Sequence, residues 1–266
     1  MPASIPRNVL VLGDVFGRPG CRALFVGLKG LVKDYKADVV VVNGENAADG
    51  FGITPEISND LFALGVHVIT SGNHIWQKQE IYPALSSETP IIRPANYPSG
   101  APGKGIAYIE VKGWSLAVVN LQGREDMPAI DCPFKTATDI LRKMRSDIKT
   151  VIIDFHAEAV EEKEALMAHL DGQVTAILGT HTHVQTADEY VSSKGTAYMT
   201  DIGMTGPSQS VIGADKDISI QRSLTQLPLK MEVSENSAIV CGALVKIDSE
   251  SGRALEIEKV RRFSSL

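Results

Sequence analysis

Residues 38–46 read Asp-Val-Val-Val-Val-Asn-Gly-Glu-Asn, an unbroken apolar run that ends in a polar cluster. A run of this kind is typical of a strand that is buried on both faces within a parallel sheet. The same pattern occurs before it at residues 8–14 and after it at residues 66–74. Helical signals follow each run, most clearly at Thr54-Pro55, where a capping hydroxyl precedes a proline suited to the first helical position. These successive units of strand, polar turn and helix predict a parallel α/β sheet, with functional residues at the carboxyl ends of its strands.

The remaining chain predicts further strands and helices. After a proline-rich loop at residues 90–102, two strand patterns flank Gly113-Trp114 like a β-hairpin. The alternation of strand and helix then resumes up to about residue 188, beyond which only strands are expected. The expected helices are 19–35, the one that starts at 55, 77–85, 135–146 and 161–170, and the later strands are 106–112, 115–121, 150–155, 174–178, 190–192, 196–200, 238–247 and 254–260. The sequence thus predicts one α/β domain over residues 1–266, with two stacked mixed β-sheets flanked by helices.

Residues 203–228 differ from the rest of this predicted domain. They are rich in glycine, serine and aspartate and show no regular periodicity. An irregular segment of this length is usually functional, so we expect a lid over the site or a contact between copies in a homo-oligomer.

Composition and charge restrict the classes of partner. The chain has 44% hydrophobic and 22% charged residues, which is ordinary for a globular protein, and its formal net charge is -6. This balance argues against a surface that binds extended nucleic acid, although bound metal ions can still attract a small phosphate. The three cysteines are widely spaced, which argues against a disulfide framework and a thiolate zinc site. No apolar stretch is long enough to cross a membrane, so we expect a cytoplasmic protein.

Side chains suited to metal binding stand where five of the predicted strands end. They are Asp14, Glu45 with Asn46, Asn73 with His74, His156, and His181 with His183. Taken singly, most have a plainer explanation, since a carboxylate can cap a helix and an Asn-containing pair can form a polar turn. The early glycines have neither the dinucleotide nor the phosphate-loop spacing. Taken together, these side chains predict a pair of metal ions.

The segment His181-Thr-His183 is the sharpest of these signals. Alternate residues of an extended segment point to the same side, so both imidazoles could reach one cavity and bind one ion each. A mixture of imidazole, amide and carboxylate ligands suits transition metals of the middle of the first row better than calcium or magnesium. By contrast, we interpret His67 and His169 as structural, because neither has an acidic or histidine partner nearby in sequence. Whether Arg93, Asn96 or Arg124 contacts a substrate stays open.

The order of these motifs resembles the calcineurin-like metallophosphoesterases. The chain departs from their general pattern at several points, notably at Phe16, which stands where a metal-binding histidine is expected, and at Glu45, which replaces an aspartate. These departures match the YmdB-like phosphodiesterase branch. Its motifs Asn-Gly-Glu-Asn-Ala-Ala, Arg-Pro-Ala-Asn-Tyr-Pro and Gly-Thr-His-Thr-His all occur here in order. The resemblance covers essentially the full length and implies a metallophosphoesterase sandwich.

The resemblance also implies a role for each site residue. The implied ligands of the first metal are Asp14, Glu45, Asn46 and His183, with Asn46 in place of the histidine missing at Phe16. Glu45 is implied to bridge, and the second metal is completed by Asn73, His156 and His181. His74 is implied to stay unligated beside the substrate. The family's metals are typically iron or manganese, and its substrates include 2',3'-cyclic AMP.

From this set we hypothesise a dinuclear phosphodiesterase, in which a hydroxide held between two metals attacks a small cyclic nucleotide in line. His74 would then act as the catalytic acid on the leaving oxygen. Two alternatives stay open. The same site could belong to a metal-dependent nucleotide sensor with little turnover, or to a phosphomonoesterase or nuclease on the same scaffold.

Overall fold

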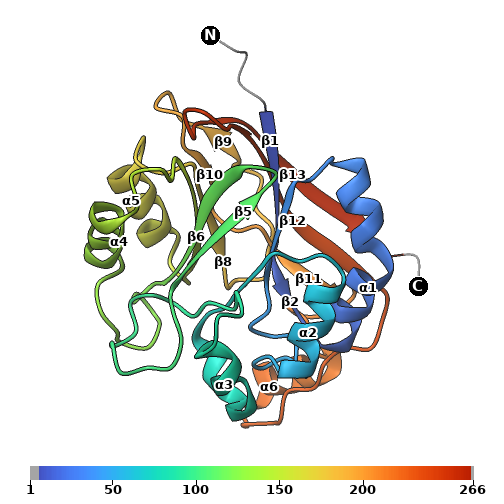
Figure 1. The fold of residues 1–266 in the computed structure, drawn as a ribbon. Helices are drawn as coiled ribbons and strands as arrows, with labels where there is room; N and C mark the ends of the chain where they lie inside the picture. The colour runs from blue at the N-terminus through green and yellow to red at the C-terminus, as the bar shows by residue number, and fades with distance from the viewer. Residues whose placement is uncertain (1–5, 265–266) are drawn as a thin grey trace.

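A computed structural model describes residues 6–264, which form two β-sheets stacked face to face with helices on both outer sides (Figure 1). The first sheet has the strand order β2-β11-β12-β1-β3-β4, with β13 also paired to β12, and the second has the order β5-β6-β7-β8-β10-β9. The strands are β1 (Pro6–Leu12), β2 (Asp14–Val15), β3 (Val39–Asn43), β4 (Val68–Thr70), β5 (Ile106–Val111), β6 (Trp114–Gln122), β7 (Thr150–His156), β8 (Ala176–Thr180), β9 (Tyr190–Val191), β10 (Ala197–Met199), β11 (Met204–Pro207), β12 (Ala238–Asp248) and β13 (Ala254–Phe263). The prediction of two stacked mixed sheets is confirmed.

Parallel pairing is found where the alternation of strand and helix predicts it. Strand β1 pairs in parallel with β3, and β3 with β4. In the second sheet, β6 pairs in parallel with β7, β7 with β8, and β8 with β10. The predicted hairpin is also present, since β5 and β6 are antiparallel and are joined at Lys112 and Gly113. Both of these residues have positive φ, at 52° and 72°, as the favoured two-residue hairpin turns require.

The helices cover the outer face of each sheet because alternate residues of a buried strand point to opposite sides. Val9 and Val11 of β1 pack between the two sheets, whereas Leu10 and Leu12 pack under the outer helices. Helices α1 (Gly17–Asp34) and α2 (Pro55–Ala63) lie against the first sheet, and α4 (Pro133–Lys143) and α5 (Val160–Leu170) lie against the second (Figure 1). The Thr54 side chain accepts a hydrogen bond from the Ile57 N–H, which confirms the predicted helix cap.

One prediction about the helices holds only in part, and another is wrong. The segment expected at residues 77–85 begins as 3-10 turns, η1 (Asn73–Gln77) and η2 (Gln79–Ile81), before the short α3 (Tyr82–Leu85). The prediction that only strands follow residue 188 is wrong, because helix α6 (Lys216–Thr225) lies beyond it. Residues 203–228, expected to be irregular, contain this helix and strand β11. The Asp215 side chain caps α6, yet none of the helix's residues is buried. The ten residues of α6 include only three apolar side chains, Ile218, Ile220 and Leu224, which are too few to form the stripe that predicts a helix from sequence.

No helix within residues 6–264 combines the length and the hydrophobicity needed to span a bilayer.

Candidate metal centre

The predicted site residues meet at one edge of the sandwich because several strands end there. Glu45 follows β3, Asn73 follows β4, and His156 is the last residue of β7. Asp14 begins β2, directly after β1, and His181 follows β8. Strands of both sheets thus deliver side chains to a common place, as the sequence predicts.

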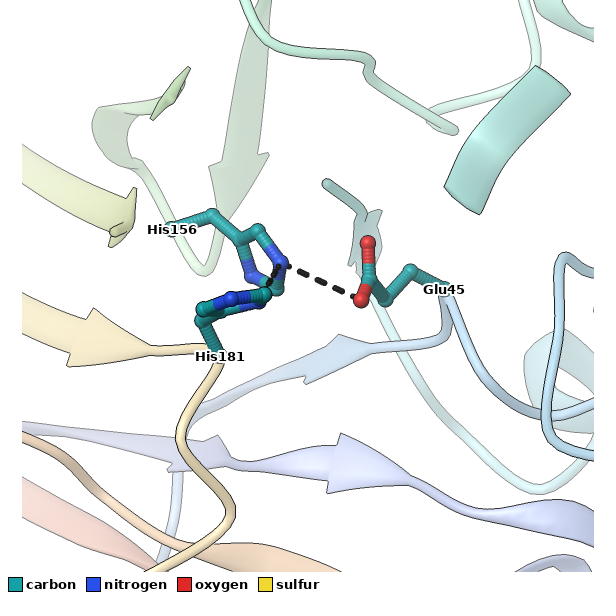
Figure 2. Close-up of side chains that lie close together, drawn as sticks. All are labelled: Glu45, His156 and His181. Carbon is teal, nitrogen blue, oxygen red and sulfur yellow. Dashed lines mark hydrogen bonds and ion pairs between the residues drawn. The ribbon is translucent and has the colours of Figure 1, made fainter. Parts of the chain in front are cut away.

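The first group of donors forms around His156. Its Nε2 lies 3.1 Å from Glu45 Oε1, 3.2 Å from Asn73 Oδ1 and 3.0 Å from His181 Nδ1. Figure 2 shows Glu45, His156 and His181 pointing toward one another from three separate segments of chain. One ligand atom from each of these three residues lies within 4.8 Å of the others, which is close enough for a single metal ion. His156 and Glu45 are fully buried, so both are removed from competing water.

The second group of donors forms around Asp14. Its Oδ2 lies 3.2 Å from His183 Nε2, and the same nitrogen lies 3.2 Å from Asn46 Nδ2. Asn46 Nδ2 is in turn 3.1 Å from Glu45 Oε1, so Glu45 lies between the two groups. In this arrangement the Asn46 oxygen faces His74 instead of Asp14. A half-turn of the amide would exchange its oxygen and nitrogen and present the oxygen that a metal ligand requires.

Phe16 explains why an asparagine stands in this group. The Phe16 ring is buried and contacts the His183 ring edge-on, with ring centroids 5.3 Å apart. Phe16 also forms a parallel bridge with Asn46, which brings the Asn46 side chain next to the place that a histidine at residue 16 would occupy. An apolar ring cannot bind a metal, so Asn46 is the donor available at this position.

His181 and His183 reach different groups for a reason that the sequence did not reveal. Both have positive φ, at 104° and 65°, so the segment is not the extended strand whose alternation we assumed. Strand β8 ends at Thr180, and the chain then turns sharply. His181 points to His156, whereas His183 points to Asp14.

His74 lies beside both groups, with its Nδ1 3.4 Å from Glu45 Oε1. Its Nδ1 is 2.7 Å from Asn46 Oδ1, and its side chain is about one-quarter exposed at 26%. Phe51 contacts the ring edge-on, at 4.9 Å between centroids. Because Nδ1 faces Asn46, Nε2 is the nitrogen that remains for a substrate.

The carboxylates make the centre attractive to cations. Burial alone would lower the pKa of His156, but the adjacent Glu45 carboxylate outweighs it and raises that pKa to about 9. Burial would likewise raise the pKa of Glu45, but the attraction of His156 holds it well below its usual range. His181 behaves differently, since burial and the neighbouring His156 lower its pKa to about 4. A neutral imidazole is the form that binds a metal.

Two buried side chains that sequence reasoning missed orient His156. Thr180 Oγ1 donates to Asp154 Oδ1 at 2.7 Å and lies 2.9 Å from His156 Nδ1. A hydroxyl has one proton to donate, so Thr180 must accept from a protonated Nδ1. Nε2 is then the nitrogen that faces Glu45 and Asn73, and it is the one that would bind a metal once its proton is lost. Such outer partners commonly set the tautomer of metal-binding histidines. In the sequence, Asp154 interrupts an otherwise apolar strand, and Thr180 belongs to the motif Gly-Thr-His-Thr-His.

The donors fit metal ions on two further observations. Asp14 is fully buried, its Oδ1 accepts no hydrogen bond from residues 6–264, and its Oδ2 lies 3.2 Å from His183 Nε2; a buried carboxylate is costly unless a cation neutralises it. A Cβ at Gly72 would lie only 2.2 Å from Glu45 Oε2 and from His156 Cδ2. The main chain thus approaches the donors closely and leaves no room for a side chain between them.

The polar residues left open by the sequence have structural contacts. The Arg93 guanidinium is buried and donates to main-chain carbonyls, including that of Pro94 at 2.8 Å. Asn96 donates to the Gln122 carbonyl at 2.7 Å. His67 accepts from the Val40 N–H at 3.1 Å, and His169 lies 3.0 Å from the Thr138 hydroxyl, which agrees with their structural interpretation. The Arg124 main chain is held by Glu162.

Comparison with known proteins relates this arrangement to one family. The family described as YmdB-like protein matches residues 10–260. The chain belongs to this family. It is 43% identical over 253 residues to a Bacillus subtilis (strain 168) protein named 2',3'-cyclic-nucleotide 2'-phosphodiesterase, and the match covers 95% of this chain and 96% of the relative. The resemblance inferred from the sequence motifs is therefore confirmed.

Solved structures agree on the fold of this YmdB-like protein. A Mycoplasma pneumoniae protein described as a novel phosphatase superposes with a TM-score of 0.92 at 34% identity, covering 98% of this chain and 94% of that one. Haemophilus influenzae NAD nucleotidase superposes with a TM-score of 0.62 at 15% identity, covering 98% of this chain and 50% of that one. At that identity the second match shows the fold alone. The fold is the metallophosphoesterase sandwich that the motifs predict.

Proposed function

We propose that this YmdB-like protein is a dinuclear metal-dependent phosphodiesterase that hydrolyses small cyclic nucleotides of the 2',3'-cyclic AMP type. Its place among the phosphoric ester hydrolases is supported by the family and by the Bacillus subtilis relative, whose name states this substrate class. The observation that carries the proposal is the position of Glu45. Its Oε1 lies 3.1 Å from His156 Nε2 and 3.1 Å from Asn46 Nδ2, so one carboxylate faces both groups of donors.

Each group of donors would hold one ion. Asp14, Asn46 and His183 would hold the first, and Asn73, His156 and His181 the second, with Glu45 shared between them. When bound, two transition-metal ions supply a nucleophile from water at neutral pH, offset the charge of the phosphate and align the reacting atoms. The mixed oxygen and nitrogen donors suit iron or manganese.

His74 would donate a proton to the leaving group. Its Nδ1 lies 2.7 Å from the Asn46 side-chain amide, which orients the ring. With the Asn46 oxygen turned to the metal, Asn46 Nδ2 would donate to Nδ1 and leave a protonated Nε2 for the substrate. Protonated Nε2 would donate to the ribose oxygen as its bond to phosphorus breaks. A positioned acid of this kind usually contributes about 10²- to 10⁴-fold to the rate.

A substrate panel tests the proposal. Metal-stripped protein would be supplied with manganese or iron and assayed against 2',3'- and 3',5'-cyclic nucleotides, a chromogenic diester and a phosphate monoester. We expect metal-dependent hydrolysis with preference for the 2',3'-cyclic nucleotide. Tight binding of that nucleotide without product over hours would favour the nucleotide sensor instead, and preference for the monoester would favour a phosphomonoesterase.

Several finer points stay predictions from the sequence. They are the identity of the native metal, a cytoplasmic location, the association of copies into a homo-oligomer and the role of residues 203–228 as a lid or contact.

A further inference from the structure

A buried ion pair lies directly behind the proposed metal centre. Lys163 of α5 and Asp201, which follows β10, are each 1% exposed, and Lys163 Nζ lies 3.0 Å from Asp201 Oδ2. Replacing a buried ion pair with apolar residues is often neutral for stability. Fold stability alone therefore does not explain why this ion pair is present. The other hydrogen bonds of Asp201 indicate a further role.

The Asp201 carboxylate holds the residue between the two histidines. Its Oδ2 accepts from the Thr182 N–H at 3.1 Å and from the Thr182 hydroxyl at 2.8 Å. Thr182 separates His181, which points to His156, from His183, which points to Asp14. One oxygen atom thus fixes the main chain from which both groups of donors take an imidazole.

This fixation matters because the histidine segment is strained. His181 and His183 have φ of 104° and 65°, values that side chains other than glycine rarely adopt. Such conformations persist only where the surrounding structure enforces them. The bonds from Thr182 to Asp201 supply that enforcement at the residue between the two strained positions.

The second oxygen of Asp201 holds a turn that packs against the chain beside Asp14. Oδ1 accepts from the Gly203 N–H at 2.8 Å, closing a turn in which Gly203 has a φ of 81°. The Gly203 carbonyl packs so tightly on Gly13 that a Cβ there would lie 1.7 Å from the oxygen. Gly13 directly precedes Asp14, so the turn fixed by Asp201 also supports the strand end that carries this carboxylate.

We infer that Asp201, neutralised by Lys163, is a positioning residue that sets the geometry of both groups of metal donors through Thr182 and Gly203. This inference rests on the proposed metal centre. Asp201 touches neither metal nor substrate in this role. Removing an outer partner of this kind typically weakens metal binding about 10- to 100-fold.

The test measures Mn²⁺ affinity by competition with a chromogenic chelator, together with the thermal midpoint of each metal-stripped variant. Asp201→Asn should lower Mn²⁺ affinity about 10- to 100-fold. Thr182→Val should cause a smaller loss, because its N–H still bonds Asp201, whereas Thr182→Ser keeps the hydroxyl and should bind Mn²⁺ like the unaltered protein. This matched pair decides the question even if Asp201→Asn does not fold.

Thr175→Val is the control for general destabilisation. The buried Thr175 hydroxyl donates to the Gly252 carbonyl at 2.6 Å, at the end of β8 opposite to His181. This variant should lower the thermal midpoint and leave Mn²⁺ affinity unchanged. Equal losses of affinity in Thr175→Val and Asp201→Asn would overturn the inference, as would unchanged affinity in both Asp201→Asn and Thr182→Val. Failure of the unaltered protein to bind Mn²⁺ would overturn the proposed function and this inference with it.

Discussion

The Thr180 hydroxyl lies 2.9 Å from Nδ1 of His156, and the two side chains come from the adjacent ends of β8 and β7. Because Thr180 donates its proton to Asp154 at 2.7 Å, Nδ1 of His156 must carry a hydrogen, and Nε2 is the nitrogen that can be freed for a metal. Asp154 is itself buried, and burial raises its pKa to about 6. The proposed metal ligand His156 is thus oriented by a buried chain of hydrogen bonds.

Removing the Thr180 hydroxyl should therefore weaken metal binding. In Thr180→Val the Nδ1–H of His156 loses its acceptor, and we expect Mn²⁺ affinity to fall about 10- to 100-fold. Thr180→Ser keeps the hydroxyl and serves as the matched control. Chelator competition measures both. Affinity in the valine variant equal to that of the serine variant would contradict this account of the tautomer.

Glu45 should be the least replaceable residue of the centre. Glu45→Gln removes the negative charge that faces both groups of donors, so the protein should lose at least one of two bound ions and its phosphodiesterase activity. Elemental analysis of purified protein gives the number of ions per chain. Full occupancy with normal turnover in this variant would end the two-metal proposal.

His74 should affect the rate without affecting metal content. His74→Ala removes the proposed proton donor, and kcat should fall about 10²- to 10⁴-fold while both ions stay bound. His169→Gln is a suitable control, because the His169 side chain contacts Thr138 and Phe134 of α4, while its main-chain carbonyl accepts from Gln173. If His74→Ala instead loses metal, His74 is a ligand and its assigned role is wrong.

Gly72 should tolerate no side chain. A methyl group at this position would lie 2.2 Å from Glu45 Oε2 and from His156 Cδ2, so Gly72→Ala should displace one of these donors and abolish metal binding. Gly27→Ala is the control, since a Cβ at Gly27 would meet no atom within 4 Å. Normal Mn²⁺ binding by Gly72→Ala would show that the centre is looser than its geometry indicates.

The ionised Asp38 carboxylate should stabilise the fold at neutral pH, and this contribution should be lost at strongly acidic pH. Lys112 and Arg7 lie 3.0 Å and 3.3 Å from its Oδ1, and these partners, opposing burial, lower the pKa of Asp38. Since the folded-state pKa lies below the unfolded value of about 3.9, the contribution is present above that pH and disappears as pH falls through the folded pKa. Asp38→Asn should reduce the free energy of unfolding at pH 7 by roughly 0.2–1 kcal/mol. Urea titrations at pH 7 and near pH 2 should show a smaller difference at the second pH than at the first.

The predictions that succeeded depend on local sequence. An apolar run that ends in a polar cluster indicates both a buried strand and the side chains at its carboxyl end, as at residues 38–46. The hairpin at Gly113 and the helix cap at Thr54 are likewise set by a few adjacent residues. Helix α6 was missed because its ten residues carry only three apolar side chains, too few for the local pattern that predicts a helix.

The sequence by itself determined the two sheets, the strand ends that carry polar side chains and the family, since all of these depend on local patterns and motifs. Only the tertiary structure decided which groups meet. It brought His156 of one sheet to Glu45 of the other, directed His181 and His183 to different donors through left-handed turns, and set Asp201 behind Thr182. These contacts join residues from segments far apart in the chain, and hydrogen bonds and ion pairs act through distance in space, which no local pattern of residues specifies.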